Sequence, residues 1–140
     1  MARPLNITCI TLGVKDLKRA AKFYQAWGFK AGPPMEGVAF FQLQGTILSL
    51  FGAGALAKDA GLPKGWAKPG GCSLAVNLGS KKAVDALYAK ALKAGAKAQK
   101  QPHDAFWGGY SGYVRDPDGH LWELAWNPFW KLDGQGSVKL

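Results

Sequence analysis

Histidine and cysteine, two of the side chains that most often hold metal ions, are scarce in this chain. The 140 residues include two of each, and the cysteines, Cys9 and Cys72, lie far apart in the sequence. Such a pair provides neither a disulfide framework nor the closely spaced ligands of a zinc knuckle. We therefore expect both cysteines to be small, buried or half-buried thiols.

Long hydrophobic runs are missing as well. The longest, ILSLFGAGALA at 47–57, contains glycines and is far shorter than the roughly 20 apolar residues that a membrane-spanning helix needs. The N-terminal segment MARPLNITCITLGV has neither the apolar core nor the cleavage site of a signal peptide. The sequence therefore predicts a cytoplasmic protein with no membrane partner.

Acidic residues are also few, 9 against 18 basic ones, which gives a net charge of +9. The distribution of this charge argues against nucleic acid, because the arginines are scarce and no basic cluster alternates with exposed aromatic residues as a stacking platform requires. Many lysines instead fall in and after one predicted helix, as on a solvated face: Lys81, Lys82, Lys90, Lys93, Lys97 and Lys100. We expect no nucleic-acid partner, and steering of a small anion stays open.

Predicted strands and helices follow one another in a set order in the first half of the chain. Residues 6–14 alternate and are rich in β-branched side chains, which predicts a strand. Residues 15–29 carry apolar side chains at helical spacing. Residues 38–44 and 46–52, joined at Gly45, then predict a hairpin.

The second half repeats this order. Residues 72–79 predict a strand and residues 80–96 a helix. Residues 108–115 and 120–127 predict a second hairpin, in which the sequence Asp-Pro-Asp-Gly at 116–119 suits a type I turn. Asp16 and Ser80 are expected to cap the starts of the two helices, and Gly28 and Gly95 to end them.

This repetition predicts an α+β fold of paired βαβββ modules. A module with its helix on one face of the sheet leaves the other face bare, and two modules can curl their bare faces into a cupped mixed sheet around a central cleft, with the helices on the outside. The predicted organisation is a single domain, 1–140, with one module at about 5–56, a linker or flexible flap at 57–71, a second module at 72–130 and a tail at 131–140.

Alternation along the strands separates helix-facing residues from cleft-facing residues. The predicted cleft-facing set is small, partly aromatic and only partly polar, which is typical of a small-molecule site rather than of a solvated surface or a sealed core. It consists of Cys9, Thr11 and Gly13; Ile47, Ser49 and Phe51; Ser73, Ala75 and Asn77; and Leu121, Glu123, Ala125 and Asn127.

Two stretches, TLGVKDLKRAAKFYQAWGF near the start and GYVRDPDGHLWELAWNP near the end, resemble the vicinal oxygen chelate superfamily over about residues 5–130. This superfamily includes glyoxalase I, extradiol dioxygenases, fosfomycin-resistance enzymes and bleomycin-resistance binding proteins. The resemblance implies paired βαβββ modules, often in a homodimer. In metal-dependent members it also implies four ligands from the cleft faces of the first and last strands of each module.

Carried over to this sequence, the four ligand positions fall on Cys9, Ser49, Ser73 and Glu123. Neutral serine hydroxyls are weak ligands, and a catalytic zinc site wants three good protein donors. Of the two histidines, His103 is expected in a loop from which it could reach the cleft mouth, and His120 at the edge of the turn. We therefore predict no bound metal and no other cofactor.

Without a metal, Glu123 needs another role. It is expected to anchor a donor group of a ligand or to serve as a structural hydrogen-bond partner, rather than to act in general acid–base catalysis, for which no nucleophile–base pair is visible. The chain has six tryptophans, and several aromatic side chains outside the predicted core suit a planar ligand. The predicted ligand-binding residues are Cys9, Thr11, Ser49, Phe51, Ser73, Asn77, Trp107, Tyr110 and Glu123.

Two functions remain open at this point. The leading hypothesis is a metal-free, homodimeric protein that binds a small, partly aromatic organic molecule, with sequestration of a toxic compound such as an antibiotic as its use; the basic charge argues against a cationic ligand. The alternative is a glyoxalase-like lyase or isomerase, or a dioxygenase, that uses a divalent metal with Cys9, Glu123 and His103.

Overall fold

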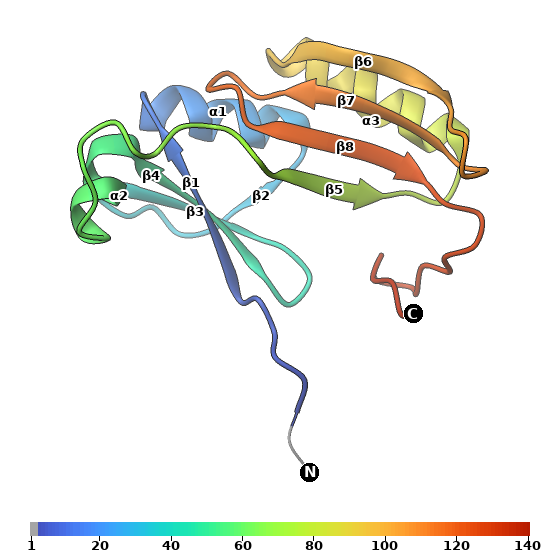
Figure 1. Ribbon diagram of the computed structural model, residues 1–140, viewed down its shortest axis with the longest axis horizontal. Coiled ribbons are helices and arrows are strands. Elements are labelled where there is room, and N and C mark those ends of the chain that lie inside the picture. Colours follow the sequence, from blue (N-terminus) through green and yellow to red (C-terminus); the bar gives the residue numbers. More distant parts are fainter. Residues whose placement is uncertain (1–2) are drawn as a thin grey trace.

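The computed structural model describes residues 3–140 and shows two four-stranded mixed sheets with three helices (Figure 1). The first half contains β1 (Cys9–Val14), α1 (Leu17–Trp27), β2 (Lys30–Ala31), β3 (Val38–Gln42), β4 (Ile47–Gly52) and α2 (Ala53–Asp59). The second half contains β5 (Ser73–Asn77), α3 (Lys81–Ala94), β6 (Lys97–Asp104), β7 (Tyr110–Arg115) and β8 (Leu121–Trp126).

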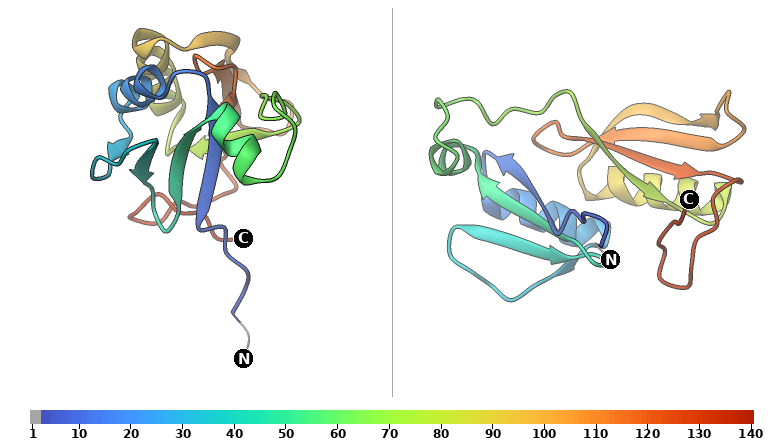
Figure 2. Two further views of the ribbon diagram at one scale, coloured as in Figure 1. Left: turned by 90° about the vertical axis from the view of Figure 1, so that its left-hand side faces the viewer. Right: turned by 60° about the horizontal axis from the view of Figure 1, so that its bottom comes forward.

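The strand order is the same in both sheets, β1-β4-β3-β2 and β5-β8-β7-β6. In each sheet the first and last strands of the module pair in parallel, and the other pairs are antiparallel. This confirms the predicted α+β fold of paired βαβββ modules. Figure 2 shows the two modules side by side, joined by the segment between α2 and β5.

The helix ends follow the predicted capping residues. The side chains of Asp16 and Ser80 each accept a hydrogen bond from the backbone N–H three residues later, at 3.0 and 3.1 Å. Gly28 and Gly95 follow the last helical residues with φ of 121° and 120°, a backbone conformation that favours glycine. Four local sequence signals thus set the bounds of α1 and α3.

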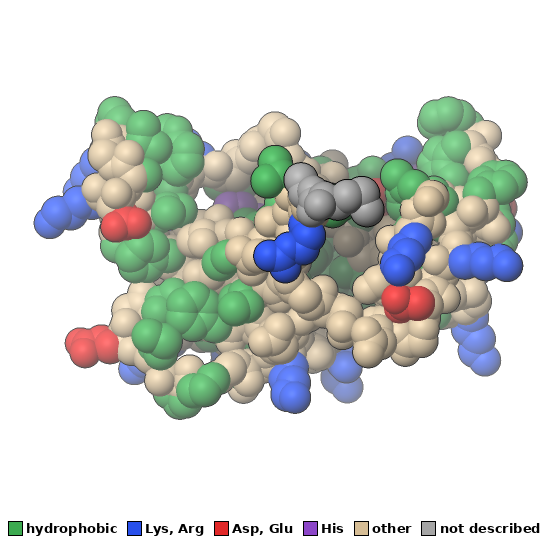
Figure 3. Space-filling view, turned by 90° about the horizontal axis from the view of Figure 1, so that it is seen from below, with side chains coloured by type: hydrophobic (Ala, Val, Ile, Leu, Met, Phe, Trp, Pro, Cys, Tyr) green, Lys and Arg blue, Asp and Glu red, His purple; other side chains and the backbone are tan. Residues whose placement is uncertain are grey.

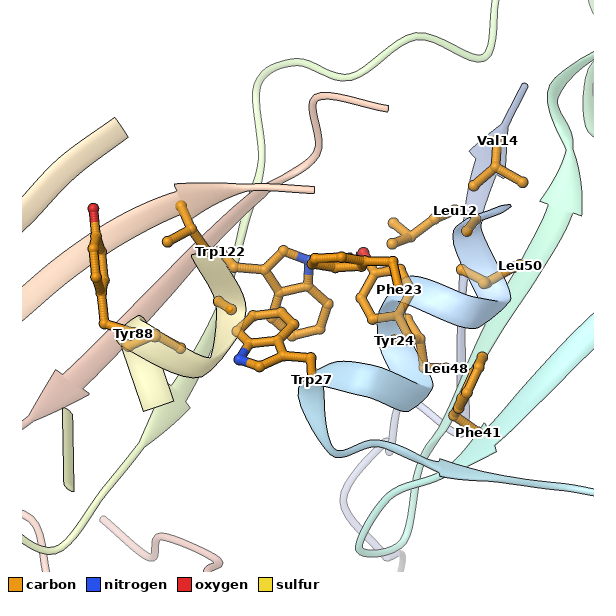
Figure 4. Close-up of a cluster of buried hydrophobic side chains, with 14 of the residues drawn as sticks. Leu12, Val14, Phe23, Tyr24, Trp27, Phe41, Leu48, Leu50, Tyr88 and Trp122 are labelled. Atoms are coloured by element: carbon orange, nitrogen blue, oxygen red, sulfur yellow. Dashed lines mark hydrogen bonds between the residues drawn. The ribbon is translucent and has the colours of Figure 1, made fainter. Parts of the chain in front are cut away.

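The two modules share one aromatic core. Helices α1 and α3 pack against each other, and Trp122 of β8 reaches α1, where its ring centroid lies 5.8 Å from that of Tyr24 and 5.4 Å from that of Trp27 (Figure 4). All three side chains are buried. Because burial of large aromatic side chains dominates the energy of a core, this contact fixes the second module on the first.

A buried carboxylate ties the hairpin turn of the second module to α1. Asp116 is 2% exposed and accepts hydrogen bonds from the Tyr24 hydroxyl at 2.5 Å and from the backbone N–H groups of Asp118 and His120. Trp122 Nε1 donates to the same Tyr24 hydroxyl at 3.0 Å. Burial and the neighbouring Asp116 charge raise the pKa of Tyr24 far above its ordinary value, so the phenol stays a donor.

Three features differ from the predictions. Residues 97–104 form β6, so His103 lies on a strand paired with Ser111 rather than in a loop. Helix α2 occupies residues that the sequence assigned to the end of the first module and the start of the linker. Cys9 and Cys72 are free, as expected, but both are exposed, because the sheet face and the linker segment that carry them are uncovered in a single chain.

Within residues 3–140 no helix combines the length and the apolar character that crossing a bilayer would require.

Candidate functional site

The faces of the two sheets that point away from the helices, here called the cup faces, carry most of the predicted site residues. Strand register makes the two cup faces comparable position by position. Thr11 pairs with Ser49 in the first sheet, and Ala75 pairs with Glu123 in the second. Ser49 and Glu123 therefore occupy equivalent positions, in agreement with the equivalence drawn from the sequence.

Glu123 lies in the middle of β8 and is half-buried. Its neighbours in register are Ala75 on β5 and Tyr113 on β7. Partial burial, the Glu123 charge and a hydrogen bond to Glu123 raise the pKa of the Tyr113 phenol. The Tyr113 phenol therefore keeps its proton at neutral pH and is a hydrogen-bond donor close to the carboxylate.

A cavity of about 290 Å³ opens beside this carboxylate, and we call it the Glu123 cavity. Its walls combine two indole rings and small apolar side chains with two amides and one carboxylate: Ala75, Asn77, Trp107, Glu123, Ala125, Asn127 and Trp130. Apolar walls with a few polar groups are the ordinary composition of small-molecule sites. The cavity can hold an aromatic ring and can orient a hydrogen-bond donor attached to it.

Gly109 positions one wall of the Glu123 cavity. A Cβ atom at Gly109 would lie 1.8 Å from Cζ3 of Trp107 and 2.5 Å from the Trp126 carbonyl oxygen, so the indole ring of Trp107 packs on the bare backbone of this glycine. Only glycine permits this approach, because real Cβ atoms do not come so close to other heavy atoms.

A second cavity, of about 690 Å³, lies where β1, the start of β5, the start of β8 and the linker meet, and we call it the junction cavity. Thr11 and Ser73 line this cavity, whereas Asn77, Trp107 and Glu123 line the other, and the two share no lining residue. Viewed from below, the surface is hollowed between the two halves (Figure 3). The predicted site residues are thus distributed between two cavities.

The remaining predicted residues lie outside both cavities. Cys9 is exposed, Ser49 is buried between neighbouring strands, and Phe51 is half-buried beside Gly13. Tyr110 is placed on the other side of the sheet: it pairs with Trp126, and its hydroxyl donates to Asp85 of α3 at 2.7 Å. Tyr110 therefore faces the helix and does not wall the cleft.

Sequence reasoning missed Tyr113 and most residues of the linker wall as site residues, whereas Asn127 was among the residues predicted to face the cleft. The signal for Tyr113 was present, because the turn at 116–119 fixes the register of the hairpin and pairs position 113 with position 123. Trp130 could not be placed in this way, since it follows the last strand and only tertiary packing brings it to the cavity.

The residues at the four ligand positions do not fit a metal ion. Cys9 and Ser49 lie on one sheet and Ser73 and Glu123 on the other, and two of the four are neutral hydroxyls, which bind metals weakly. Across residues 3–140 no group of three or more His, Cys, Asp and Glu side chains has the arrangement to hold a metal ion. The chemistry of the site is that of one carboxylate, a phenol, amides and indoles.

Comparison with known proteins agrees with this fold. A family model described as the Glyoxalase/Bleomycin resistance protein/Dioxygenase superfamily matches residues 6–124. A search of curated proteins found no match.

Among solved structures, a glyoxalase-related enzyme from Fulvimarina pelagi is 33% identical, with 96% of this chain and 97% of that chain covered and a TM-score of 0.90. A glyoxalase/bleomycin resistance protein/dioxygenase from Nocardioides is 29% identical, with 100% and 91% covered and a TM-score of 0.73. A lactoylglutathione lyase from Agrobacterium tumefaciens is 22% identical, with 90% and 96% covered and a TM-score of 0.68, and shows the fold alone.

Proposed function

Because the chain belongs to the glyoxalase/bleomycin resistance protein/dioxygenase superfamily, we propose that it binds a small, partly aromatic organic molecule without a metal ion. The observation that carries this proposal is the Glu123 cavity, in which one carboxylate stands among indole rings and amides. At the positions where metal-dependent relatives have their metal ligands, this chain has side chains that bind cations poorly. Its cup face nevertheless has a cavity suited to an organic ligand.

The binding mode follows from the walls of the cavity. The indoles of Trp107 and Trp130 contact a planar ring of the ligand, and stacking on such rings is specific in geometry. The Glu123 carboxylate accepts a hydrogen bond from an N–H or O–H group on that ring, and Asn77 and Asn127 offer amide donors and acceptors to further polar groups. Tyr113 lies beside Glu123 on β7.

Sequestration of a toxic compound is the proposed use, and it draws support from the bleomycin resistance proteins of the superfamily. The excess of positive charge disfavours a cationic ligand. A homodimer is part of the proposal, because the exposed Leu5 and Ile7 at the start of the chain and the uncovered cup faces offer a second copy an apolar surface. A cytoplasmic location and the lack of nucleic-acid and membrane partners stay predictions of the sequence.

Isothermal titration with two matched probes in the presence of EDTA tests the binding mode. 2-Naphthol carries the donor that Glu123 is proposed to accept, and 2-methoxynaphthalene lacks it. We expect 2-naphthol to bind more tightly, and Glu123→Gln to weaken its binding about tenfold, as the loss of a charge-assisted hydrogen bond would do. Ser49→Ala, at the equivalent position of the first module, is the control and should leave binding unchanged.

Equal binding of the two probes, or equal effects of Glu123→Gln and Ser49→Ala, would contradict the proposed contact. Loss of all binding in EDTA, with recovery on addition of a divalent cation, would instead indicate the enzymatic alternative.

That alternative, a divalent-metal lyase or isomerase or a dioxygenase, draws its support from the F. pelagi relative, which is named a glyoxalase-related enzyme. The third metal ligand in this alternative would be His103. Strand register places His103 on the cup face, because it pairs with Ser111, which in turn pairs with Ala125. However, His103 lies on β6, two strands away from β8, which carries Glu123. Metal analysis of the purified protein separates the two functions.

A further inference from the structure

The junction cavity has its own construction and shares no residue with the Glu123 cavity. Its volume of about 690 Å³ lies in the range of small-molecule sites. One wall comes from β1, another from the starts of β5 and β8, and the linker after α2 closes it. Ligands often bind where two structural units meet, because neither unit alone needs to fill the space there.

The linker is folded over β1 in this region. A Cβ atom at Gly13 would lie 2.9 Å from Cβ of Ala67, so the linker touches the buried backbone of the strand. Backbone bonds from Trp66 N–H to Pro63 and from Lys68 N–H to Trp66 give the segment turns of its own. The segment that the sequence marked as a linker or flexible flap therefore contributes a wall of the junction cavity.

The charged side chains on the walls are all basic. Arg115 and Lys68 line the junction cavity together with the imidazole of His120, and no Asp or Glu stands among its lining residues within the described chain. Among the described residues, Arg115 donates to two neutral acceptors, Oε1 of Gln99 and the carbonyl oxygen of Gly119. In residues 3–140 neither Arg115 nor Lys68 forms a salt bridge, so both charges are available to a ligand.

The nearby carboxylates of the turn are engaged elsewhere. Asp116 is held by Tyr24 and by backbone N–H groups. Asp118 accepts from the backbone N–H of Lys15 at 2.8 Å and lies 3.5 Å from the Arg19 guanidinium. Hydrogen bonds and the Arg19 guanidinium therefore partly compensate their charges, although Oδ2 of Asp118 is buried without a hydrogen-bond partner among the described residues.

His120 adds a polar edge with a defined orientation. Its Nε2 lies 2.8 Å from the carbonyl oxygen of Gly13, and because a carbonyl can only accept, Nε2 carries a proton and the ring is fixed at the cavity wall. Gly70 and Gly71 also line the cavity and contribute only backbone. Their N–H groups make no hydrogen bond within the part of the chain that the structure describes.

We propose that the junction cavity binds a small amphipathic organic anion, with an apolar or aromatic body and a carboxylate or phosphate group. The anion lies against Arg115 and Lys68, whose donors match the oxygens of such groups. The body lies against the apolar part of the walls, which includes Leu12, Leu56, Trp66 and Leu121. This site is independent of the proposed ligand at Glu123.

The two free cysteines allow a local test, because both are exposed and only Cys72 lines the junction cavity. The full chain is treated with N-ethylmaleimide, with and without 1-naphthaleneacetate, and the labelling rate of each cysteine is read by peptide mass spectrometry. We expect the anion to slow the labelling of Cys72 several-fold and to leave Cys9 unchanged. Equal changes at both cysteines, or no change at Cys72, would overturn the proposal.

Matched probes and variants test whether the junction cavity recognises the negative charge of the ligand. By isothermal titration, 1-naphthaleneacetate should bind about tenfold more tightly than 1-naphthaleneacetamide, since the amide lacks the charge that Arg115 and Lys68 recognise. Lys68→Gln should reduce this preference, whereas Lys93→Gln, which removes the same charge from the exposed end of α3, should retain it. Equal affinities of acid and amide, or equal effects of the two lysine variants, would contradict the proposal.

1-Naphthyl phosphate separates the two anion classes, and tighter binding than that of the acetate assigns the site to phosphates. Arg115→Lys keeps the charge but loses the planar fork, and it should lower affinity for whichever anion binds. Glu123→Gln serves as the control for independence: it should leave anion binding intact even if the ligand proposed for the Glu123 cavity proves wrong.

Discussion

The two modules place different side chains on the same strand register. At equivalent positions of the cup faces, the first module has Ser49 beside Phe40 and the second has Glu123 beside Tyr113. The first face is neutral and lacks a strong acceptor, while the second has a carboxylate with a phenol donor next to it. The comparison teaches that the fold provides the positions and that the choice of side chain decides the chemistry.

The helix-facing sides of the sheets differ in the same way. Leu48 of β4 pairs with Phe41 of β3, and Trp122 of β8 pairs with Val114 of β7. Leu48 and Trp122 therefore occupy equivalent positions in the two sheets. Leu48 is buried within the core, but the larger Trp122 crosses to α1 and joins the modules. The second module thus carries both the carboxylate of the site and the aromatic contact that holds the halves together.

Replacing Trp122 of the second module with leucine, the residue at the equivalent position of the first, should have the largest effect on stability. Trp122→Leu removes the ring that contacts Tyr24 and Trp27 and leaves a cavity between the modules. We expect the free energy of unfolding to fall by on the order of 3 kcal/mol, as for other large-to-small core substitutions. Chemical denaturation measures this loss. Leu48→Met, which nearly conserves volume, is the control and should cost less than about 1.5 kcal/mol.

The equivalent tyrosines of the two helices offer a second contrast. Tyr24 donates to the buried Asp116 carboxylate, whereas Tyr88 donates at 3.2 Å to a backbone carbonyl in a part-buried position. Tyr24→Phe should lower the free energy of unfolding by about 2 kcal/mol and Tyr88→Phe by about 0.5 kcal/mol, because the first leaves a charged acceptor without its donor. Equal losses would show that Asp116 does not depend on Tyr24.

Alkaline pH should reduce the difference between wild type and Tyr24→Phe. The pKa of Tyr24 is raised in the folded state from its ordinary value of 10.0, so above that pH the unfolded chain loses a proton that the folded chain keeps. Stability from this group is therefore complete below pH 10 and declines as pH rises. Between about pH 9 and pH 11, the difference in unfolding free energy should shrink by roughly 1.4 kcal/mol. If the difference in unfolding free energy between wild type and Tyr24→Phe stayed constant across this pH range, the raised pKa of Tyr24 would be contradicted.

The smallest effect is expected at Tyr113. Tyr113→Phe makes this position like Phe40 of the first module and removes the donor beside Glu123. Affinity for 2-naphthol should change by a few-fold, with a loss of unfolding free energy of about 0.5 to 1 kcal/mol, the range of one ordinary hydrogen bond. A change as large as that of Glu123→Gln would mean that the phenol itself contacts the ligand.

Local sequence signals predicted much of the fold. Period-two alternation placed Glu123 and Trp122 on opposite faces of β8, and capping residues placed the ends of α1 and α3, because both depend on neighbours in the sequence. Strand β6 was missed since its residues, KAQKQPHD, are polar, include a proline and lie at a sheet edge. Such a strand forms through pairing with β7 rather than through its own propensity.

The site was harder to predict than the fold. Glu123, Asn77 and Trp107, all in the predicted ligand-binding set, line one cavity, whereas Thr11 and Ser73 line another that the linker also borders. Tyr110 was assigned to the wrong face, since no parity was drawn for β7. The wall formed by the linker depends on contacts between residues far apart in the sequence, which alternation and spacing do not report.

Metal content is the most direct test of the claim that the cup face binds an organic molecule without a cation. The protein is purified without chelator and its zinc, nickel, manganese and iron are measured by mass spectrometry, for the wild type and for Glu123→Gln. We predict far less than one equivalent of any of these metals in both proteins. One equivalent per chain in the wild type that disappears in Glu123→Gln would contradict the account and indicate a metal-dependent enzyme.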